Sequence, residues 1–276
     1  MEKIVLYGKG GIGKSTVAAN LSAVYAKNGK KVIHIGCDPK HDSSSLLIGQ
    51  RRVKTVIKEL FSTPSNQVKR EQIIMPGVYG IDCVEAGGPE PGVGCGGRGI
   101  TRMFEALDDL DVLAKGAYEV AVFDVLGDVV CGGFAAPLRS GYAEKIFIVT
   151  SEEVMSLYAA NNICKAVKRY EPNGVVLGGL IANIRDTGDD ASAVERFAKT
   201  IQTQVVAVIG RDPIFREAER RLMPLIDLAP DHKVSKVFQD LADRILALDV
   251  KKCSSPKPLD DDAFDEFVER HHGNAV

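Results

Sequence analysis

The sequence contains no uninterrupted apolar run approaching the roughly 18 residues that a membrane-spanning helix needs. It also has no excess of positive charge, because 35 Lys and Arg face 37 Asp and Glu, for a net charge of −2. A dedicated nucleic-acid-binding domain is usually strongly basic. The first residues enter an apolar run at once, without the charged, apolar and cleavage regions of a secretory signal. We therefore expect a cytoplasmic protein that binds neither membranes nor nucleic acid.

Cysteine pairs of the CxxC type are also missing, so a zinc ribbon built from a single chain is not indicated. In a cytoplasmic chain of this size, a disulfide framework is not expected either. Each cysteine is then either a small buried apolar residue or a metal or redox residue. The six cysteines stand at positions 37, 83, 95, 131, 164 and 253.

Apolar runs alternate with helical stretches along the 276 residues. Most of these runs are continuous, which is typical of strands buried on both faces of a parallel sheet. We therefore predict an α/β fold with a doubly wound, mostly parallel sheet. The expected strands are 3–7, 32–35, 80–84, 120–123, 146–149, 176–181 and 205–209, and the expected helices are 15–27, 99–113, 153–169, 190–201 and 231–248.

We expect one domain over residues 1–250 and a C-terminal tail over residues 251–276. The tail begins with a Ser-Ser-Pro-Lys-Pro break and continues with three aspartates and a short amphipathic stretch, Phe264 to Val268. Chain termini are often loosely held, so a partly ordered extension is the first interpretation. The alternative is a strap that lies against a partner subunit.

A glycine-rich stretch between the first expected strand and helix matches the phosphate-binding pattern G-x-x-x-x-G-K-[ST]. In such a loop the backbone N–H groups point at phosphate oxygens, and the following helix adds the positive end of its dipole. We predict that Lys14 reaches the β- and γ-phosphates and that the Ser15 hydroxyl ligates Mg²⁺. The loop residues are Gly8, Lys9, Gly10, Gly11, Ile12, Gly13, Lys14 and Ser15.

Carboxylates follow two of the expected strands. Asp38 and Asp42 come directly after the second strand, while Asp124 ends the run 120–123 and Asp128 follows it. Doubly wound folds bind ligands at this carboxyl edge of the sheet. A single aspartate there would be an ordinary cap or turn residue. Several of them beside one phosphate loop favour water positioning and Mg²⁺ ligation.

Two cysteines lie in glycine-rich surroundings. Cys95 stands within Gly92–Gly99 and Cys131 is followed by Gly132 and Gly133. Exposed backbone N–H groups of this kind donate hydrogen bonds to the sulfurs of iron–sulfur clusters. Two thiolates cannot complete the set of four that a cluster usually needs, but a two-fold dimer sharing one cluster would supply four.

At these residues the sequence resembles the nitrogenase iron protein family, which includes the reductase components of nitrogenase-like enzymes. The resemblance covers roughly residues 3–248 and rests on several long motifs in order. They are Tyr7-Gly8-Lys9-Gly10-Gly11-Ile12-Gly13-Lys14-Ser15-Thr16, Gly36-Cys37-Asp38-Pro39-Lys40, Glu85 through Cys95, Asp124 through Phe134, and Tyr158-Ala159-Ala160-Asn161-Asn162-Ile163.

The resemblance implies an ATP-hydrolysing reductase that works as a homodimer bridged by one [4Fe–4S] cluster, with Cys95 and Cys131 of each chain as its ligands. It further implies that MgATP drives low-potential electrons from a donor such as ferredoxin or flavodoxin to a larger catalytic component. Each residue role that it implies is an expectation for this chain. Lys9, Asp38 and Asp128 would be the catalytic residues: Lys9 would cross to the partner's nucleotide, Asp38 would belong to a first switch segment, and Asp128 would orient the attacking water. Lys14, Thr16 and Asp42 would belong to the nucleotide site, and Asn183 would contact adenine.

The segment from Asp124 to Cys131 would be the second switch. Fully extended, it spans at most about 23–25 Å. One short segment therefore reaches both the expected Mg²⁺ site and the expected cluster. We predict that a change at the γ-phosphate is transmitted to Cys131, as in other nucleotide switches.

Several features bear on which branch of the family this chain resembles. Arg98 resembles nitrogenase reductases, in which an arginine at this place lies on the partner-docking face and can be ADP-ribosylated. His41 and the run Ala135–Leu138 resemble tetrapyrrole-reducing branches, and a further branch reduces methylthio-alkanes. A rival class is a partitioning or metal-insertion ATPase without a resident cluster. Partitioning ATPases lack the two cysteines in their glycine settings, and metal-insertion ATPases carry a CxxC pair that is absent here.

Overall fold

The structure is a computed structural model of the chain. It describes residues 1–64, 67–89, 94, 96–127, 135–139, 141–186, 188 and 190–272, with side chains as far as residue 270.

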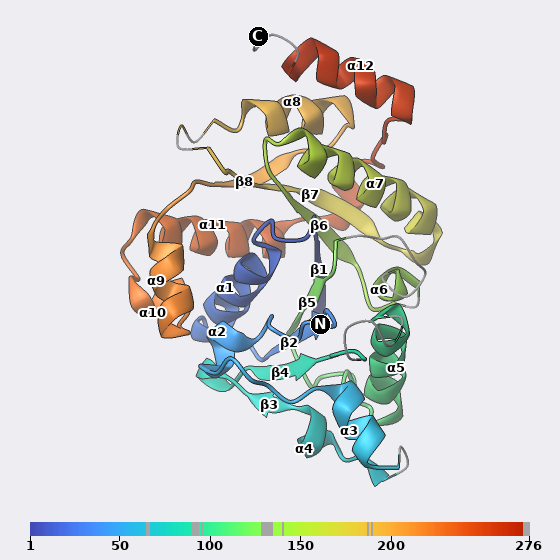
Figure 1. The fold of residues 1–276 in the computed structure, drawn as a ribbon, viewed down its shortest axis with the longest axis vertical. Coiled ribbons are helices and arrows are strands. Elements are labelled where there is room, and N and C mark those ends of the chain that lie inside the picture. Colours follow the sequence, from blue (N-terminus) through green and yellow to red (C-terminus); the bar gives the residue numbers. More distant parts are fainter. Residues whose placement is uncertain are drawn as a thin grey trace.

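The centre of the protein is an eight-stranded sheet with the strand order β3-β4-β2-β5-β1-β6-β7-β8 (Figure 1). All neighbouring strands run parallel except the short β3, which pairs antiparallel with β4. This arrangement confirms the predicted doubly wound α/β class. The strands are β1 (Glu2–Tyr7), β2 (Val32–Cys37), β3 (Met75–Pro76), β4 (Asp82–Glu85), β5 (Val120–Val125), β6 (Lys145–Thr150), β7 (Val176–Asn183) and β8 (Val205–Ile209).

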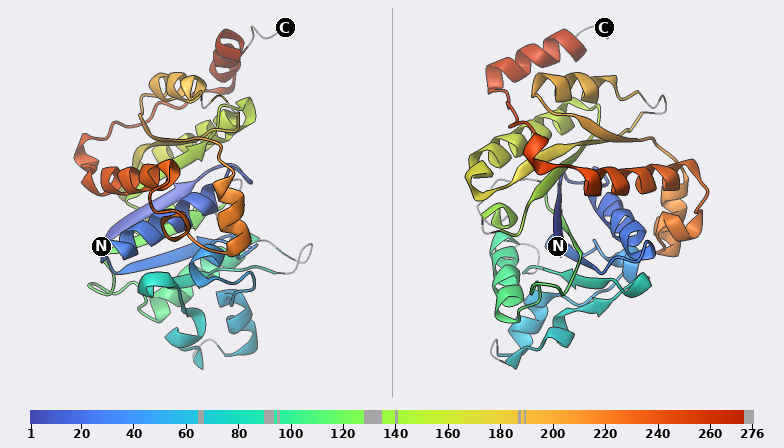
Figure 2. Two further views of the ribbon diagram at one scale, coloured as in Figure 1. Left: turned by 90° about the vertical axis from the view of Figure 1, so that its left-hand side faces the viewer. Right: turned by 180° about the vertical axis from the view of Figure 1, so that it is seen from behind.

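Helices cover both faces of the sheet (Figure 2). One apolar core joins the sheet to α1, α2, α9, α10 and α11, and the other joins it to α3, α4, α5, α6, α7, α8 and α12. The longer helices are α1 (Lys14–Lys27), α5 (Gly96–Asp109), α7 (Val154–Tyr170), α8 (Ser192–Thr200), α9 (Ile214–Arg221), α11 (Lys233–Ala247) and α12 (Asp261–His272). The shorter ones are α2 (Ser45–Ile48), α3 (Val56–Ser62), α4 (Arg70–Ile73), α6 (Ala136–Arg139) and α10 (Leu225–Leu228).

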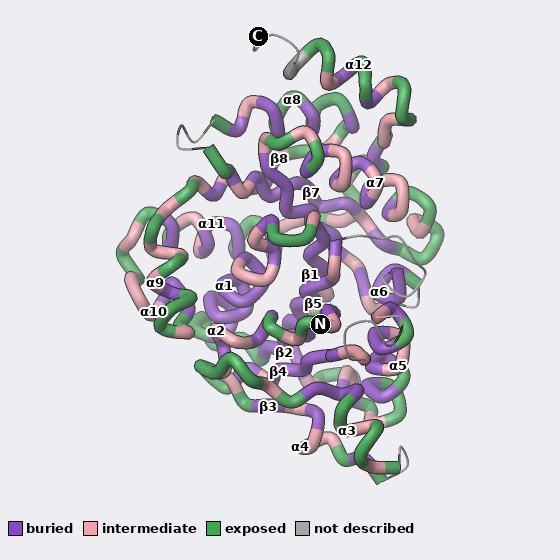
Figure 3. Tube along the Cα trace, in the orientation of Figure 1, coloured by how far each residue is buried: buried purple, intermediate pink, exposed green. Residues whose placement is uncertain are grey.

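The central strands are buried along their whole length, as the continuous apolar runs predicted (Figure 3). Several polar residues interrupt this apolar character, and two of them matter for the site. Asp124 in β5 and His34 in β2 are both fully buried. Because burying a polar group is costly unless it has partners, both positions need hydrogen bonds or opposite charges nearby.

The C-terminal segment folds back onto its own chain. Helix α12 lies beside α8 and α7 at one end of the molecule (Figure 1), and its Phe264 and Phe267 are 3% and 5% exposed. Phe267 meets Phe197 of α8 edge-on, with ring centroids 5.7 Å apart. Asn161 of α7 fixes the approach by hydrogen bonds to both backbone groups of Leu259, each 2.8 Å long. Phe264 and Phe267, with the partly buried Leu259, therefore belong to the same core as the sheet.

Candidate functional site: a phosphate loop at the carboxyl edge of the sheet

The candidate site lies at the carboxyl ends of β2, β5 and β1, which are neighbours in the sheet. Asp124 is paired in register with Leu6 of β1 on one side and with Gly36 of β2 on the other. The parallel register therefore places this carboxylate between the loop that follows β1 and the loop that follows β2. This is the edge at which doubly wound sheets bind ligands.

The loop after β1 has the backbone shape of a phosphate cradle. Gly13 stands at the N-terminus of α1 with φ 94°, a left-handed conformation that favours glycine. A Cβ at this position would also lie 2.4 Å from the Asn183 amide nitrogen. No described side chain caps the first turn of α1. Its N–H groups and the positive end of its dipole are therefore available to an anion.

Lys14 and Asp124 form a buried ion pair beneath this loop. The Lys14 Nζ lies 2.6 Å from Asp124 Oδ1, and the two side chains are 7% and 0% exposed. Burial by itself raises the pKa of Asp124, but the Lys14 charge and hydrogen bonds from Lys14, Ser15 and Ser43 outweigh it and hold the pKa below its ordinary value. The structure thus brings together the predicted phosphate lysine, the predicted Mg²⁺ serine and the strand-end carboxylate.

The two acidic residues after β2 lie on the same edge. Asp38 is largely buried, and its Oδ1 accepts a hydrogen bond of 2.9 Å from the backbone N–H of Lys40. Burial raises the pKa of Asp38, against the opposing effects of that hydrogen bond and of Lys14. Asp42 is exposed and lines a cavity of about 400 Å³ together with Ser15, Thr16 and Ser43. The Asp42 carboxylate therefore lies at a cavity beside the phosphate loop, whereas that of Asp38 is largely enclosed.

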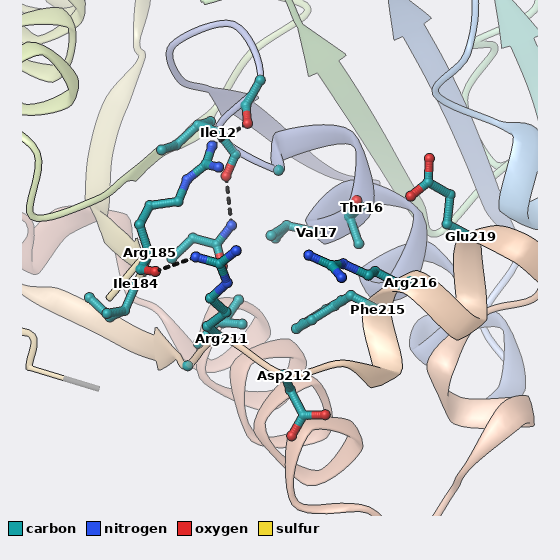
Figure 4. Close-up of a pocket in the computed structure, with 15 residues that line it drawn as sticks. Ile12, Thr16, Val17, Ile184, Arg185, Arg211, Asp212, Phe215, Arg216 and Glu219 are labelled. Carbon is teal, nitrogen blue, oxygen red and sulfur yellow. Dashed lines mark hydrogen bonds between the residues drawn. The ribbon is translucent and has the colours of Figure 1, made fainter. Parts of the chain in front are cut away.

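A second cavity, of about 300 Å³, adjoins the phosphate loop (Figure 4). Asn183, at the end of β7, donates a hydrogen bond of 2.6 Å to the Ile12 carbonyl. Arg185 donates to the Gly11 carbonyl, and Arg211 donates to the Arg185 carbonyl over 3.0 Å. The cavity thus combines apolar surface with amide and guanidinium groups, a composition suited to a nucleoside.

Part of this second cavity was not predicted. Its far wall is formed by the end of β8 and by α9, and the residues missed there are Arg211, Asp212, Phe215, Arg216 and Glu219. Helix α9 is short and mostly charged, and only Ala218 is fully buried, so few apolar residues mark it in the sequence. The Gly210-Arg211-Asp212-Pro213 break directly after a strand was the available clue, because that strand also ends at the ligand-binding edge.

The segment 38–44 also contacts the strand and loop that lead to Cys95. The backbone N–H and the hydroxyl of Ser44 each donate a 2.6 Å hydrogen bond to Oε1 of the fully buried Glu85. Burial raises the pKa of Glu85 to about 8. Its Oε2 has no hydrogen-bond partner among the described residues. A Cβ on Gly36 would come 2.1 Å from that oxygen, so glycine is needed there.

Pro39 makes the second contact with this loop. A Cβ on Gly88 would lie 2.8 Å from Pro39 Cβ, and one on Gly96 would lie 2.5 Å from Pro39 Cγ. Gly96 is the first residue of α5 and directly follows Cys95. The proline that follows Asp38 therefore packs against the backbone on both sides of the predicted cluster loop.

Three predicted residues, Cys95, Asp128 and Cys131, lie outside the described residues. Lys9 is half-buried in the phosphate loop, and Arg98 is exposed in the first turn of α5. The other cysteines are accounted for individually: Cys37, Cys83 and Cys164 are buried, and Cys253 is half-buried. Within the described part of the chain, no three His, Cys, Asp or Glu residues are grouped so as to hold a metal ion.

Residues 2–273 match the family described as 4Fe-4S iron sulfur cluster binding proteins, NifH/frxC family. The chain is 43% identical to the nitrogenase iron protein of Methanococcus voltae over 270 residues, which are 98% of this chain and 96% of that protein. It is 44% identical to the one from Methanospirillum hungatei over 271 residues, 97% of this chain and 95% of that protein.

Among solved structures, the fold is similar to the cell division protein MinD of Aquifex aeolicus, with a TM-score of 0.68 and 21% identity over 91% of this chain and 98% of that one. The cell division ATPase MinD of Pyrococcus furiosus gives a TM-score of 0.69 and 23% identity over 90% and 100%. At these identities the likeness shows the fold alone. None of the helices in the described ranges is long and apolar enough to cross a membrane.

The sequence matches confirm the resemblance found in the motifs and the enzyme class that it implied, an ATP-hydrolysing reductase component. The chain belongs to the NifH/frxC family of 4Fe-4S iron–sulfur cluster binding proteins.

Proposed function

We propose that this chain is the ATP-dependent electron-delivering component of a nitrogenase or a nitrogenase-like reductase. Two copies would share one [4Fe–4S] cluster, with Cys95 and Cys131 of each chain as its ligands. The cluster would supply one-electron chemistry at low potential, and the electrons would come from a donor such as ferredoxin or flavodoxin. MgATP would control their delivery to a larger catalytic component.

The described residues fit MgATP. The phosphates would lie on the N-terminus of α1 and the loop before it, where Gly13 has the required left-handed conformation. Lys14 would contact phosphate oxygens, while Ser15 and Asp124 would serve the Mg²⁺ ion, which prefers oxygen ligands. The cavity beside Asn183 would take the adenosine. Since Lys14 and Asp124 bind one another in the structure, a triphosphate and its cation would compete for both partners at once.

The positions of the cysteines and two backbone contacts also fit a shared cluster. The four cysteines that the structure describes are dispersed rather than grouped, which leaves Cys95 and Cys131 as the thiolates in glycine-rich loops. Gly96, beside Cys95, packs on Pro39 of the first switch segment. Gly127, in the second switch segment, packs on Gly8 of the phosphate loop. Both cysteine-bearing segments therefore touch parts of the nucleotide site.

The single observation that carries the proposal is the contact between Gly127 and Gly8. It places the start of a short segment on the phosphate loop, and the same segment ends at Cys131. A nucleotide that reshapes the phosphate loop would move Gly127 and change the position of the sulfur ligand. Coupling of this kind is what a nucleotide-controlled electron carrier needs.

Anaerobic purification tests the cluster. We expect a brown protein with about four irons per dimer, in keeping with a [4Fe–4S] cluster and its usual set of four cysteines. Cys95→Ser and Cys131→Ser should each lose the colour, whereas Cys164→Ser, which changes a buried cysteine on α7, should keep it. An iron-free protein that hydrolyses ATP normally without oxygen would contradict the proposal and favour the partitioning-type rival.

The final substrate is decided by the catalytic component. Arg98 favours a nitrogenase, whereas His41 and the run Ala135–Leu138 favour the tetrapyrrole-reducing branches, and a methylthio-alkane reductase is the further alternative. Reduced protein should be mixed with MgATP and each type of catalytic component in turn. Turnover with only one type assigns the branch, and turnover with none would contradict the electron-delivery role.

A further inference from the structure

His34 is a fully buried histidine that has no assigned role in the nucleotide site. It lies in the middle of β2, and both of its ring nitrogens have partners. Nδ1 is 2.9 Å from the Ser22 hydroxyl of α1, and Nε2 is 2.8 Å from the Ser43 hydroxyl. The Ser43 hydroxyl in turn donates a 2.5 Å hydrogen bond to Asp124 Oδ2. A continuous chain of side chains therefore leads from α1 to the site.

The direction of each hydrogen bond follows from the number of protons. Asp124 is held as a carboxylate by its ion pair with Lys14 at 2.6 Å, and a carboxylate can only accept. Ser43 has a single hydroxyl proton and must give it to Asp124. Its oxygen can then only accept from His34, so Nε2 carries the ring proton and Nδ1 accepts from the Ser22 hydroxyl.

A neutral ring with its proton on Nε2 satisfies every partner in this chain. Burial lowers the pKa of His34 to about 4, with Asp124 opposing the shift and Lys14 adding to it, which agrees with a neutral imidazole. The ring itself is fixed, because β2 holds the backbone and Ser22 holds Nδ1. The Nε2–H group is therefore held in place as a donor to the Ser43 hydroxyl oxygen.

We propose that His34 is a positioning residue of the ATPase, which aims the only hydroxyl proton of Ser43 at Asp124 and thereby ties the segment 38–44 to the end of β5. Ser43 directly follows Asp42, and Asp38 lies five residues before it. The placement of these carboxylates relative to Asp124 therefore depends on this tie. Its consequence for catalysis rests on the proposed ATP hydrolysis, whereas the hydrogen-bond chain itself does not.

Two substitutions separate hydrogen bonding from space filling. His34→Leu fills the buried position with an apolar side chain and removes both hydrogen bonds. His34→Gln keeps an N–H donor that can reach Ser43. We expect kcat for ATP hydrolysis to fall about tenfold or more in the leucine variant, since small misplacements of catalytic groups are costly. We expect KM for ATP to stay nearly constant and the glutamine variant to recover most of kcat.

A matched control removes a buried serine hydroxyl elsewhere. Ser235 of α11 is 1% exposed, and its hydroxyl donates to the Ala229 carbonyl over 2.7 Å, with the Leu225 carbonyl 3.2 Å away. Ser235→Ala should therefore lower stability without a selective loss of kcat. In a Ser43→Ala background, His34→Leu should cause no further loss of kcat, because the residue through which it acts is already gone.

A second readout does not depend on activity. In protein labelled with ¹³C-histidine, the ring carbon shifts of His34 should report the neutral form with the proton on Nε2. The His34→Gln spectrum identifies the resonance. A ring with its proton on Nδ1, or a charged ring, at neutral pH would overturn the proposal. So would normal kcat in His34→Leu, an equal loss in both His34 variants, or additive losses with Ser43→Ala.

The two proposals fail in different ways. A wild-type protein that hydrolyses no ATP would count against the proposed function alone. The carbon shifts of His34, and their change in Ser43→Ala, would still decide whether the hydrogen-bond chain exists.

Discussion

Gly127 touches Gly8 backbone to backbone: a Cβ on Gly127 would lie 1.5 Å from the Gly8 carbonyl oxygen and 2.8 Å from the Lys9 nitrogen. No side chain fits in that space. The contact joins the loop after β1 to the segment after β5, two stretches that are far apart in the sequence.

This contact predicts the effect of a single methyl group. Gly127→Ala should push the two loops apart and weaken MgATP binding at least about tenfold, because the phosphate loop loses its shape. Isothermal titration calorimetry with MgATP measures the effect. Gly188→Ala is the control, since nothing lies within 4 Å of a Cβ there. Equal affinities for wild type and Gly127→Ala would show that the loops adjust freely.

The buried ion pair of Lys14 and Asp124 predicts that substitutions at the two positions have coupled effects on the free energy of unfolding. Lys14→Met alone leaves a buried carboxylate without its counter-charge and should lower the free energy of unfolding by roughly 3–5 kcal/mol. Adding Asp124→Asn removes that charge and should restore much of the loss. Urea unfolding of the two single variants and the double variant, without nucleotide, measures the coupling. Additive losses would mean that the ion pair contributes little.

Glu85 predicts a pH dependence of stability. Its pKa is raised by burial from an ordinary 4.5 to about 8, so between these values the folded chain holds a proton that the unfolded chain releases. The contribution of Glu85 is therefore fully favourable below pH 4.5 and is lost as the pH rises towards 8. Glu85→Gln should remove this loss. Its stability relative to wild type should rise between pH 5 and pH 8 by a few kcal/mol.

Denaturant unfolding across that pH range measures the Glu85 effect. Glu269→Gln removes the same charge from an exposed position on α12, and its profile should run parallel to that of the wild type. A Glu85→Gln profile that is also parallel to the wild type would show that the buried carboxyl does not retain its proton.

The C-terminal helix predicts a stability effect within one chain. Phe267 is 5% exposed among Phe197 and Phe264, so Phe267→Ala should cost about 3 kcal/mol, as large-to-small changes in a core do. Phe61→Ala is the matched control, because that ring is 83% exposed. Thermal unfolding compares them. If both variants unfold like wild type, α12 does not pack on α8 in solution.

Much of this architecture could be predicted because buried parallel strands have a simple signature. The runs 32–35, 120–123 and 146–149 are continuous and apolar, and each lies within an observed strand. The phosphate loop, Asp38, Asp42 and Asp124 could be placed at one edge because every one of them follows such a run. Parallel register then brings them together, as seen for Asp124 beside Leu6 and Gly36.

Other features depend on contacts between distant residues. Nothing in the run Val32–Ile35 shows that His34 meets serines 12 positions before it and 9 after it. The charged helix α9 lines a cavity because it follows β8, whose end lies beside the phosphate loop. Phe264 and Phe267 suggested an amphipathic stretch, but the surface that accepts them, on α7 and α8, lies some 65 to 110 residues earlier in the sequence, about the length of a small domain.

Pro39, wedged against Gly88 and Gly96, has a consequence for an assembly of two chains. Under the proposed function two copies share one cluster, and within each chain the loops of the candidate site touch both cysteine-bearing segments. Each copy would therefore report its own nucleotide through its own pair of sulfurs. A dimer with ATP bound to one chain only would then hold the shared cluster asymmetrically. The two thiolates of the ATP-bound chain would be displaced, and those of the other chain would not. Such a half-loaded species should be spectroscopically distinct from the empty and the fully loaded forms.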